Sequence, residues 1–302
     1  MARLLFAKGA VGELVRRMQF RLGFTGSDLD GWFGNQTRDA VVAFQRRTGL
    51  TESGEVDVDG WTALMGEPVP SVRERCLQLT AHFEGHAFTL AQGNFDGAGI
   101  TWGIIGFTLK GGELGRIVLE TEARFPGLLR QAFGTTAGEL REIVRKPWPE
   151  QLAFADSISF GSRKTRLAEP WRTSFRRLGE MPEVQQLQIE RAREGYYEPA
   201  LATAKRWGLE SELGIALAFD VHVQNGGIKA AAKSRIEAAL GGRQAADERA
   251  LRIVIANAVA DSARLAWRED VRERKLAIAT GAGPVHGGRY ELRNWGLEEL
   301  PA

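Results

Sequence analysis

The chain has 302 residues, of which 43% are apolar, and its formal net charge is +2 at pH 7. This length and apolar content predict two domains, or one large domain, with a sizeable core, while the weak net charge argues against a strong nucleic-acid binder. The single cysteine, Cys76, excludes an intrachain disulfide framework.

The first part of the sequence predicts a small domain of three short helices. Apolar residues recur at helical spacing over residues 14–22 and again over residues 37–44. The segment "DGWFG" between these stripes is typical of a tight turn, because glycine permits backbone conformations that other residues avoid. Two prolines then flank Val69 and favour an extended connector. We therefore expect a first domain over residues 1–67 and a linker over residues 68–71.

Short motifs follow one another through this first domain: "MQ" at 18–19, "DGWFG" at 30–34, "TRDAVVAFQ" at 37–45, "GL" at 49–50, and then Thr62 and Leu64. In this order they resemble the peptidoglycan-binding domain 1 family. The resemblance implies a module that binds the sugars or peptide stems of the bacterial cell wall. Asp30, Thr37 and Gln45 could supply hydrogen bonds to such a ligand, and Trp32 could supply a stacking surface. The alternative is that these residues only build turns and caps.

The remainder, residues 72–302, is predicted to be a second domain rich in α-helices. Ser71 and Glu74 form a capping-box signature that starts a helix at Val72, and the same signature recurs at residues 136–139. Only the glycine-rich segment 87–109 predicts strands, in one small β-hairpin. Long periodic or alanine-rich runs predict further helices over residues 183–206, 211–224 and 245–278.

Two carboxylates stand out in the glycine-rich segment. Glu84 follows the predicted first helix of the second domain, and Asp96 lies in the turn-rich stretch "NFDGAG". The negative end of a helix and apolar neighbours both favour a protonated acid at Glu84, whereas Asp96 is expected to stay ionised. One protonated and one ionised carboxyl form the pair that hydrolyses glycosidic bonds. Each residue alone also fits a simpler role, a solvated helix end for Glu84 and a turn for Asp96.

The residues around this pair form an ordered pattern: Phe83-Glu84, then "DGAGIT" at 96–101, then "IGF" at 105–107. They resemble glycoside hydrolase family 46, the chitosanases of the lysozyme-like superfamily. A second segment, "ERAREGYYEPALATAKRWGL" at 190–209, followed by "GIALAFDVHVQNGG", echoes the same family. The resemblance implies that Glu84 is the general acid and Asp96 the general base, and that Thr101 helps to position the attacking water.

The predicted single-displacement reaction also sets a geometry. A water must fit between the base and the sugar, so the two carboxyls are expected about 6.5–9.5 Å apart, or somewhat further in an open state. We expect Glu84 and Asp96 to face each other across an open groove. The hydroxyl of Thr101 is expected to point into that groove.

Departures from the family pattern bear on the substrate. Ala98 replaces a charged residue of the pattern, and Gly85 stands where the family usually has an acid or an amide. The chain after residue 70 holds 32 Lys and Arg against 29 Asp and Glu. Chitosan is a polycation and favours an acidic cleft, whereas peptidoglycan carries the carboxylates of its lactyl-linked peptides. The charge therefore favours peptidoglycan.

Further polar residues lie in the segment "AFDVHVQNGG". On a helix Asp220 and Gln224 share a face, and together with His222 and Asn225 they could line the far wall of a substrate cleft. The alternative is a hydrogen-bond network that supports the core. His286, in a glycine-rich stretch near the C-terminus, is predicted to be a loop residue.

A thiol enzyme is a further alternative. Cys76 could act as a nucleophile with His82 or His86, as in an amidase, but it falls on the apolar face of its predicted helix and is expected to pack in the core. With four histidines and one cysteine, no zinc-ligand pattern appears. We expect neither a metal nor an organic cofactor.

The sequence thus predicts a cell-wall lysozyme, an N-acetylmuramidase that acts on peptidoglycan strands as a monomer, without nucleic-acid or membrane partners. A chitosanase using the same acids and a non-catalytic wall-binding protein are the alternatives. No secretory signal is evident, so we expect synthesis in the host cytoplasm and action on the wall from the periplasm after release. This arrangement resembles a phage endolysin, and a secretion-system effector would give the same sequence pattern.

Overall fold

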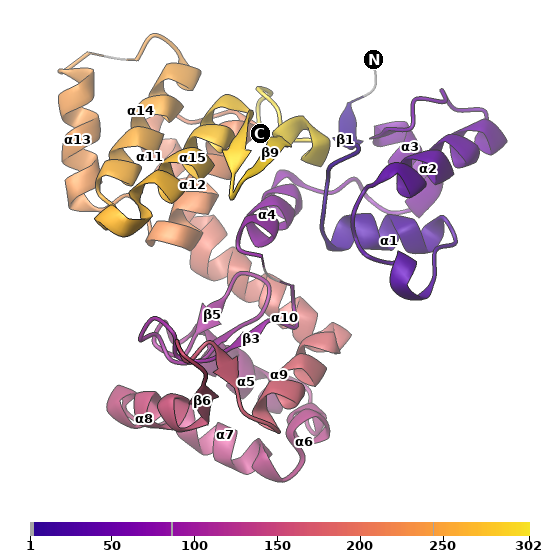
Figure 1. Cartoon of the computed structure of the whole chain (residues 1–302). Helices are drawn as coiled ribbons and strands as arrows, with labels where there is room; N and C mark the ends of the chain where they lie inside the picture. The colour runs from indigo at the N-terminus through magenta and orange to yellow at the C-terminus, as the bar shows by residue number, and fades with distance from the viewer. Residues whose placement is uncertain (1–2, 86, 244) are drawn as a thin grey trace. The chain divides into compact units, whose positions relative to one another are not determined.

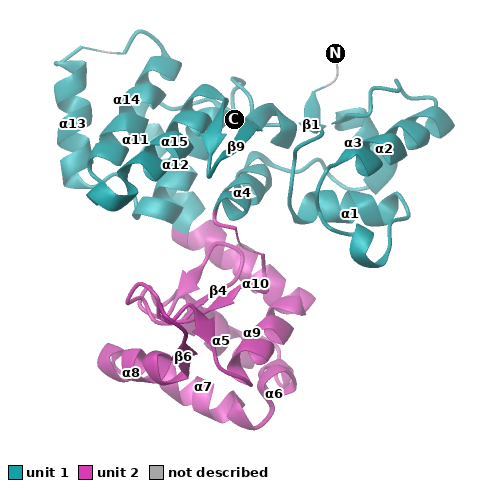
Figure 2. Ribbon diagram, in the orientation of Figure 1, with its two compact units in different colours: residues 1–83, 196–302 teal, residues 84–195 magenta. Residues whose placement is uncertain are grey.

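The computed structural model describes residues 3–85, 87–243 and 245–302. It confirms the predicted mainly α fold, in which short antiparallel strand pairs lie between the helices (Figure 1). The chain forms two compact units (Figure 2): unit 1 holds residues 1–83 and 196–302, and unit 2 holds residues 84–195. The N-terminal residues and the C-terminal third of the chain thus share one unit. The domain bounds 1–67, 68–71 and 72–302, which rest on sequence patterns, stay a prediction.

The N-terminal part of unit 1 contains the three predicted helices, α1 (Glu13–Arg21), α2 (Asn35–Thr48) and α3 (Val58–Met65), and a 3₁₀ turn, η1 (Gly26–Asp28). A strand pair that the sequence analysis did not foresee joins β1 (Leu4–Phe6) to β2 (Val56–Asp57). Phe6 of β1 and Trp61 of α3 are buried in the core of this domain, with ring centroids 5.7 Å apart. Asp57 caps α3 by accepting the backbone N–H of Gly60 at 2.8 Å.

The connector to the next helix is tied down at two points. The indole N–H of Trp61 donates to the carbonyl of Pro68 at 3.1 Å, and Nε of Arg75 donates to the carbonyl of Pro70 at 3.2 Å. Helix α4 (Val72–Phe83) then begins at the predicted residue. Its capping box forms: the Ser71 N–H donates to the Glu74 carboxylate at 2.8 Å, and the Glu74 N–H donates to Ser71 Oγ at 3.3 Å.

Helix α12 (Glu212–Asn225) is the centre of the remainder of unit 1. Every residue from 212 to 221 is buried, as expected for a helix enclosed on all sides. Helices α4, α11, α14 and α15 contact it. The other elements are α11 (Glu198–Trp207), α13 (Ala230–Leu240), α14 (Glu248–Asp261), η4 (Leu265–Trp267) and α15 (Arg268–Thr280).

The C-terminal segment packs against the first strand of the chain. It consists of the hairpin β8 (Ala282–Val285) and β9 (Gly288–Glu291), followed by the 3₁₀ turn η5 (Leu292–Trp295). The backbone N–H of Ala7 donates to the carbonyl of Asn294 at 3.1 Å. Trp295 is 1% exposed, and its indole N–H donates to the carbonyl of Val11 at 3.1 Å. The N-terminal domain is therefore packed onto the rest of its unit rather than only tethered to it.

Unit 2 is built around a three-stranded antiparallel sheet of β3 (Ala91–Gln92), β4 (Thr101–Trp102) and β5 (Phe107–Thr108), where a two-stranded hairpin was predicted. Thr101, in the central strand, pairs with Gln92 on one side and Thr108 on the other. A second pair, β6 (Ser159–Phe160) with β7 (Arg166–Leu167), was not predicted. The helical elements are α5 (Glu113–Arg124), α6 (Leu128–Phe133), η2 (Gly134–Thr136), α7 (Ala137–Ile143), α8 (Trp148–Ile158), α9 (Trp171–Glu180) and α10 (Pro182–Ala192).

Two predicted long helices are interrupted. The segment 183–206 breaks at a π-helical turn, η3 (Arg193–Tyr197), just before Pro199 in the first turn of α11. Proline lacks the N–H that a continuous helix needs, but it fits a helix start. The segment 245–278 breaks after α14, where the Ser262 hydroxyl bonds back to the carbonyl of Ala258 at 2.8 Å.

Candidate active site

Glu84 directly follows the last residue of α4, as predicted. Gly85 continues the turn with a φ of +67°, in the left-handed region that favours glycine. Phe83 anchors the helix end, because its buried ring meets Tyr290 edge-to-face with centroids 5.1 Å apart. Glu84 itself is partly buried. The local sequence thus fixes the backbone position from which this carboxyl projects.

Asp96 lies in the loop between β3 and β4 and is exposed to solvent. Its Oδ1 accepts the backbone N–H of Ala98 at 3.0 Å in an Asx turn. Gly97 and Gly99 have φ values of +79° and +80°, so the loop requires glycine at both positions. A carboxylate can accept about four hydrogen bonds, so most of the acceptor capacity of Asp96 faces solvent. The turn role and a catalytic role are therefore compatible.

Asn94 holds this loop in shape, and the sequence analysis missed it. Its side-chain oxygen accepts the N–H of Gly99 at 2.9 Å, which closes the loop, and its Nδ2 donates to Asp156 on α8 at 2.8 Å. Lys164 donates to the same Asp156 carboxylate at 2.6 Å. The hydrogen bonds from Lys164 and Asn94 lower the pKa of Asp156. The loop that carries Asp96 is thereby fixed to a second element of unit 2.

Gly93 allows the base of the same loop to approach the second strand pair. A Cβ atom here would lie 2.4 Å from the carbonyl of Lys164, closer than real Cβ contacts come. The N–H of Gly93 donates to the carbonyl of Thr165 at 3.1 Å. The glycines of this segment therefore serve loop shape and close packing, which explains why so many of them flank the two acids.

Thr101 is 6% exposed, and its hydroxyl forms no hydrogen bond within the described residues. A buried, unpaired hydroxyl costs about 1–3 kcal/mol. A water or sugar hydroxyl bound here would offset that cost, which suits the predicted positioning role. The hydroxyl is covered by protein, however, whereas a position in an open groove would expose it to solvent.

Asp220, predicted as a cleft residue, is fully buried in unit 1. Arg274 donates to its carboxylate from Nη2 at 2.6 Å and Lys275 from Nζ at 2.5 Å, and the Thr80 hydroxyl donates at 3.2 Å. Burial alone favours the neutral acid, but the charges of Arg274 and Lys275 outweigh it and lower the pKa of Asp220 to about 2. The structure thus places Asp220 in a core ion-pair network, the alternative role from the sequence, and away from solvent.

Two neighbouring side chains of α12, Gln224 and His222, also bond to other side chains of the protein. Gln224 Oε1 accepts the Lys275 ammonium at 2.5 Å. His222 Nε2 lies 2.8 Å from the Thr203 hydroxyl, and burial lowers its pKa, which favours the neutral ring. Asn225 is half-buried, and its Oδ1 has no hydrogen-bond partner in the part of the chain that the structure describes. Of the four predicted α12 residues, Asn225 therefore keeps the most capacity for a ligand.

In the N-terminal domain, three of the four predicted binding residues hold loops together. Thr37 is 1% exposed, and its hydroxyl donates to the carbonyl of Trp32 at 3.2 Å. Gln45 is 3% exposed and accepts the N–H of Gly54 at 2.9 Å. Asp30 is exposed, but its Oδ1 accepts the N–H of Trp32 at 2.8 Å. These bonds match the alternative prediction of turn and cap residues.

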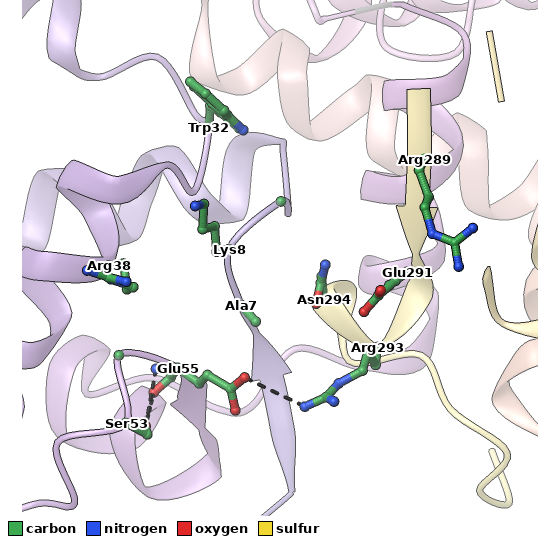
Figure 3. Close-up of a pocket in the computed structure, with 12 residues that line it drawn as sticks. Ala7, Lys8, Trp32, Arg38, Ser53, Glu55, Arg289, Glu291, Arg293 and Asn294 are labelled. Atoms are coloured by element: carbon green, nitrogen blue, oxygen red, sulfur yellow. Dashed lines mark hydrogen bonds and ion pairs between the residues drawn. The ribbon is translucent and has the colours of Figure 1, made fainter. Parts of the chain in front are cut away.

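Trp32 is the exception, because 55% of it is exposed. Its side chain lines a pocket of about 480 Å³, shown in Figure 3. The bonds of Asp30 and Thr37 to the Trp32 backbone fix the segment that presents the indole. An exposed aromatic ring on a fixed backbone is the kind of surface on which sugars and peptides stack.

The thiol alternative is not supported. Cys76 is fully buried, and burial raises the pKa of its thiol to about 12, so the reactive thiolate does not form near neutral pH. His82 is partly buried and stacks near Trp295 with ring centroids 6.0 Å apart. His86 lies outside the described residues. His286 occupies the turn between β8 and β9, which confirms the predicted loop position.

Within 3–85, 87–243 and 245–302, no group of three or more His, Cys, Asp or Glu residues could hold a metal ion. Across the same ranges, every helix is too short or too polar to cross a membrane.

Comparisons with known proteins agree with the sequence patterns. The model of glycosyl hydrolase family 46 matches residues 83–251, and the model of a peptidoglycan binding domain matches residues 9–64. No curated protein sequence matches the chain significantly.

Two solved structures share the fold. The chitosanase of Gynuella sunshinyii, in complex with chitotetraose, has 16% identity and a TM-score of 0.52 over 74% of this chain and 99% of that one. The native chitosanase of Bacillus subtilis MY002 has 18% identity and a TM-score of 0.52 over 73% and 97%. At such identity these structures establish a common fold.

Proposed function

Because the chain belongs to glycosyl hydrolase family 46 and carries a peptidoglycan-binding domain before it, we propose that it hydrolyses the β-1,4 glycan bonds of peptidoglycan. The bond that we propose is the one at C1 of N-acetylmuramic acid. Glu84 is the general acid, Asp96 the general base, and Thr101 positions the water.

The proposed reaction is a single displacement. Glu84 donates its proton to the glycosidic oxygen as the bond from that oxygen to C1 breaks. Asp96 accepts a proton from a water whose oxygen bonds to C1 from the opposite face, so the new reducing end has the inverted configuration. Proton exchange with solvent then restores the protonated Glu84 and the ionised Asp96.

The observation that carries the proposal is the Asp96 loop. It presents a solvent-facing carboxylate, yet its backbone is fixed by Asn94 and by two glycines with positive φ. The loop leads directly into the strand of Thr101, whose hydroxyl makes no hydrogen bond within the described residues. A fixed, exposed carboxylate five residues before an unsatisfied hydroxyl suits the activation of a water.

Two features support peptidoglycan as the substrate. The peptidoglycan-binding domain shares a compact unit with the C-terminal third of the chain. Unit 2, which carries both candidate acids, holds 15 Lys and Arg against 14 Asp and Glu. That balance does not provide the excess of negative charge that a polycationic substrate favours.

A chitosanase is the second candidate, because both solved structures reported above, which share this fold, are chitosanases. It would use the same two acids, so mutation of Glu84 or Asp96 alone cannot separate the candidates. The identity of the sugar that is cleaved separates them.

The test uses the purified full chain on isolated sacculi and, in parallel, on chitosan. Mass spectrometry of the products identifies the sugar at the new reducing end. N-acetylmuramic acid at that end supports the proposal, release from chitosan alone supports the second candidate, and sacculus binding without products would indicate a non-catalytic wall-binding protein. Glu84→Gln should abolish product release, whereas Glu183→Gln, at an exposed position on α10, should not.

A further inference from the structure

The N-terminal domain and the C-terminal segment are closely packed against each other. A Cβ atom on Gly296 would lie 2.9 Å from the carbonyl of Leu5, and one on Gly9 would lie 3.0 Å from Nδ2 of Asn294. The hydrogen bonds from Ala7 to Asn294 and from Trp295 to Val11 cross the same junction. Groups on the two sides of the junction therefore keep a fixed spacing.

A pocket of about 480 Å³ lies along this junction. In Figure 3, Trp32, Lys8 and Arg38 lie on the side of the N-terminal domain, and Arg289 and Arg293 lie on the side of the C-terminal segment. Glu55 and Arg293 bridge the two sides with an ion pair of 3.6 Å. Four basic and two acidic side chains line the pocket, the second acid being Glu291.

Two of the basic side chains remain available. Arg293 is paired with Glu55, and Arg38 with Asp39 at 2.7 Å. Lys8 and Arg289 are exposed, and among the described residues neither has an acid within ion-pair distance. An exposed indole with two available cations suits a ligand that combines a flat, weakly polar ring with carboxylates.

We propose that the C-terminal segment 282–295 completes the wall-binding site, and that this composite pocket holds the carboxylate-bearing peptide stem of peptidoglycan while a sugar of the strand stacks on Trp32. Neither family match extends beyond residue 251, so neither assigns a role to this segment. The inference deepens the proposed function and rests on peptidoglycan being the polymer that the protein binds.

The test measures binding of a soluble disaccharide-tetrapeptide to the full chain by calorimetry, with the same compound amidated at its carboxylates as the second probe. Arg289→Glu should lower the affinity for the acidic probe about tenfold relative to the wild type. Its affinity for the amidated probe should equal that of the wild type. Trp32→Ala should weaken both probes. Arg249→Glu, an equal charge reversal at an exposed position in the first turn of α14, should change neither.

Two outcomes would overturn the inference. If Arg289→Glu discriminates between the two probes as the wild type does, the C-terminal segment is not part of the site. A competition experiment gives the second outcome. If a phosphate-rich wall polymer displaces the bound acidic probe more strongly than an excess of unbound probe does, the pocket does not select the peptide stem. Binding of the probe is measured without any hydrolysis. Arg289-dependent binding of the probe by a protein that does not hydrolyse sacculi would therefore uphold this inference and refute the proposed enzymatic function.

Discussion

Asp96 and Asp220 are two aspartates of the predicted site that the fold treats in opposite ways. Asp96 is exposed, and a backbone N–H at 3.0 Å and a fixed loop hold it. Asp220 is buried between two cations that lower its pKa to about 2. A carboxylate whose acceptor sites are all used by the protein contributes to stability, while one with free acceptor sites on a fixed backbone can act on a ligand. The difference lies in the partners and not in the residue type.

The strongest test of this contrast is Asp96→Asn. We expect kcat to fall by about 10²–10⁴-fold, because a general base contributes on that scale. The free energy of unfolding should change by less than about 0.5 kcal/mol, as for most exposed substitutions. Initial rates and urea denaturation measure the two effects. An unchanged kcat would assign Asp96 to the turn alone.

The complementary substitution, Asp220→Asn, should mainly affect stability. Asn removes the negative charge that Arg274 and Lys275 share in the buried network, and we expect a loss of about 3–5 kcal/mol in the free energy of unfolding. Urea denaturation followed by circular dichroism provides the measurement. A variant as stable as the wild type would show that the cluster does not support the core.

Acid titration addresses the same carboxyl without mutation. Folding lowers the pKa of Asp220 from 3.8 to about 2, so the native state binds fewer protons than the unfolded state in that range. The contribution of Asp220 to the free energy of unfolding, about 2 kcal/mol, is therefore present above pH 4 and is lost as the pH falls toward 2. Unfolding midpoints at several pH values should show this decrease in the wild type. Asp220→Asn should lack the part that this group contributes.

The smallest effect is expected for the brace of the Asp96 loop. Asn94→Ala leaves the N–H of Gly99 without its partner, and we expect a loss of about 1–2 kcal/mol in stability. The rate should fall about tenfold, because the base is held less firmly. Asn94→Asp keeps the acceptor for Gly99 and should recover part of the rate. Equal rates for Asn94→Ala and wild type would mean that the loop needs no brace.

The sequence predicted helices better than it predicted their ends. The capping box at Ser71 forms as expected, but the same signature at residues 136–139 does not, because the Thr136 hydroxyl bonds to the carbonyl of Phe133 at 2.9 Å. Thr136 ends a 3₁₀ turn, so a local motif was overridden by the preceding chain. The short strand pairs were missed, because two-residue strands give no alternating pattern to detect.

The site was predictable where chemistry follows from local sequence. The helix end before Glu84 and the turn at Asp96 could be placed from capping and glycine patterns. Asn94 could not, because its partner Asp156 lies 62 residues away in the sequence. Asp220 could not be separated from a cleft residue for the same reason, since Arg274 and Lys275 lie on a distant helix. Charge partners far along the chain decide such roles.

The packing of β1 against η5 has a consequence for how the protein is made. Residues 4–6 leave the ribosome well before residues 292–295, because 285 residues separate the two segments. At about 5–20 residues per second, synthesis of the intervening chain takes roughly 15–60 s. Throughout that interval the N-terminal domain exposes the surface that Trp295 later covers. Unit 1 therefore cannot be completed until residues 292–295 have been synthesised, and a chain truncated before residue 292 would leave this surface of the N-terminal domain uncovered.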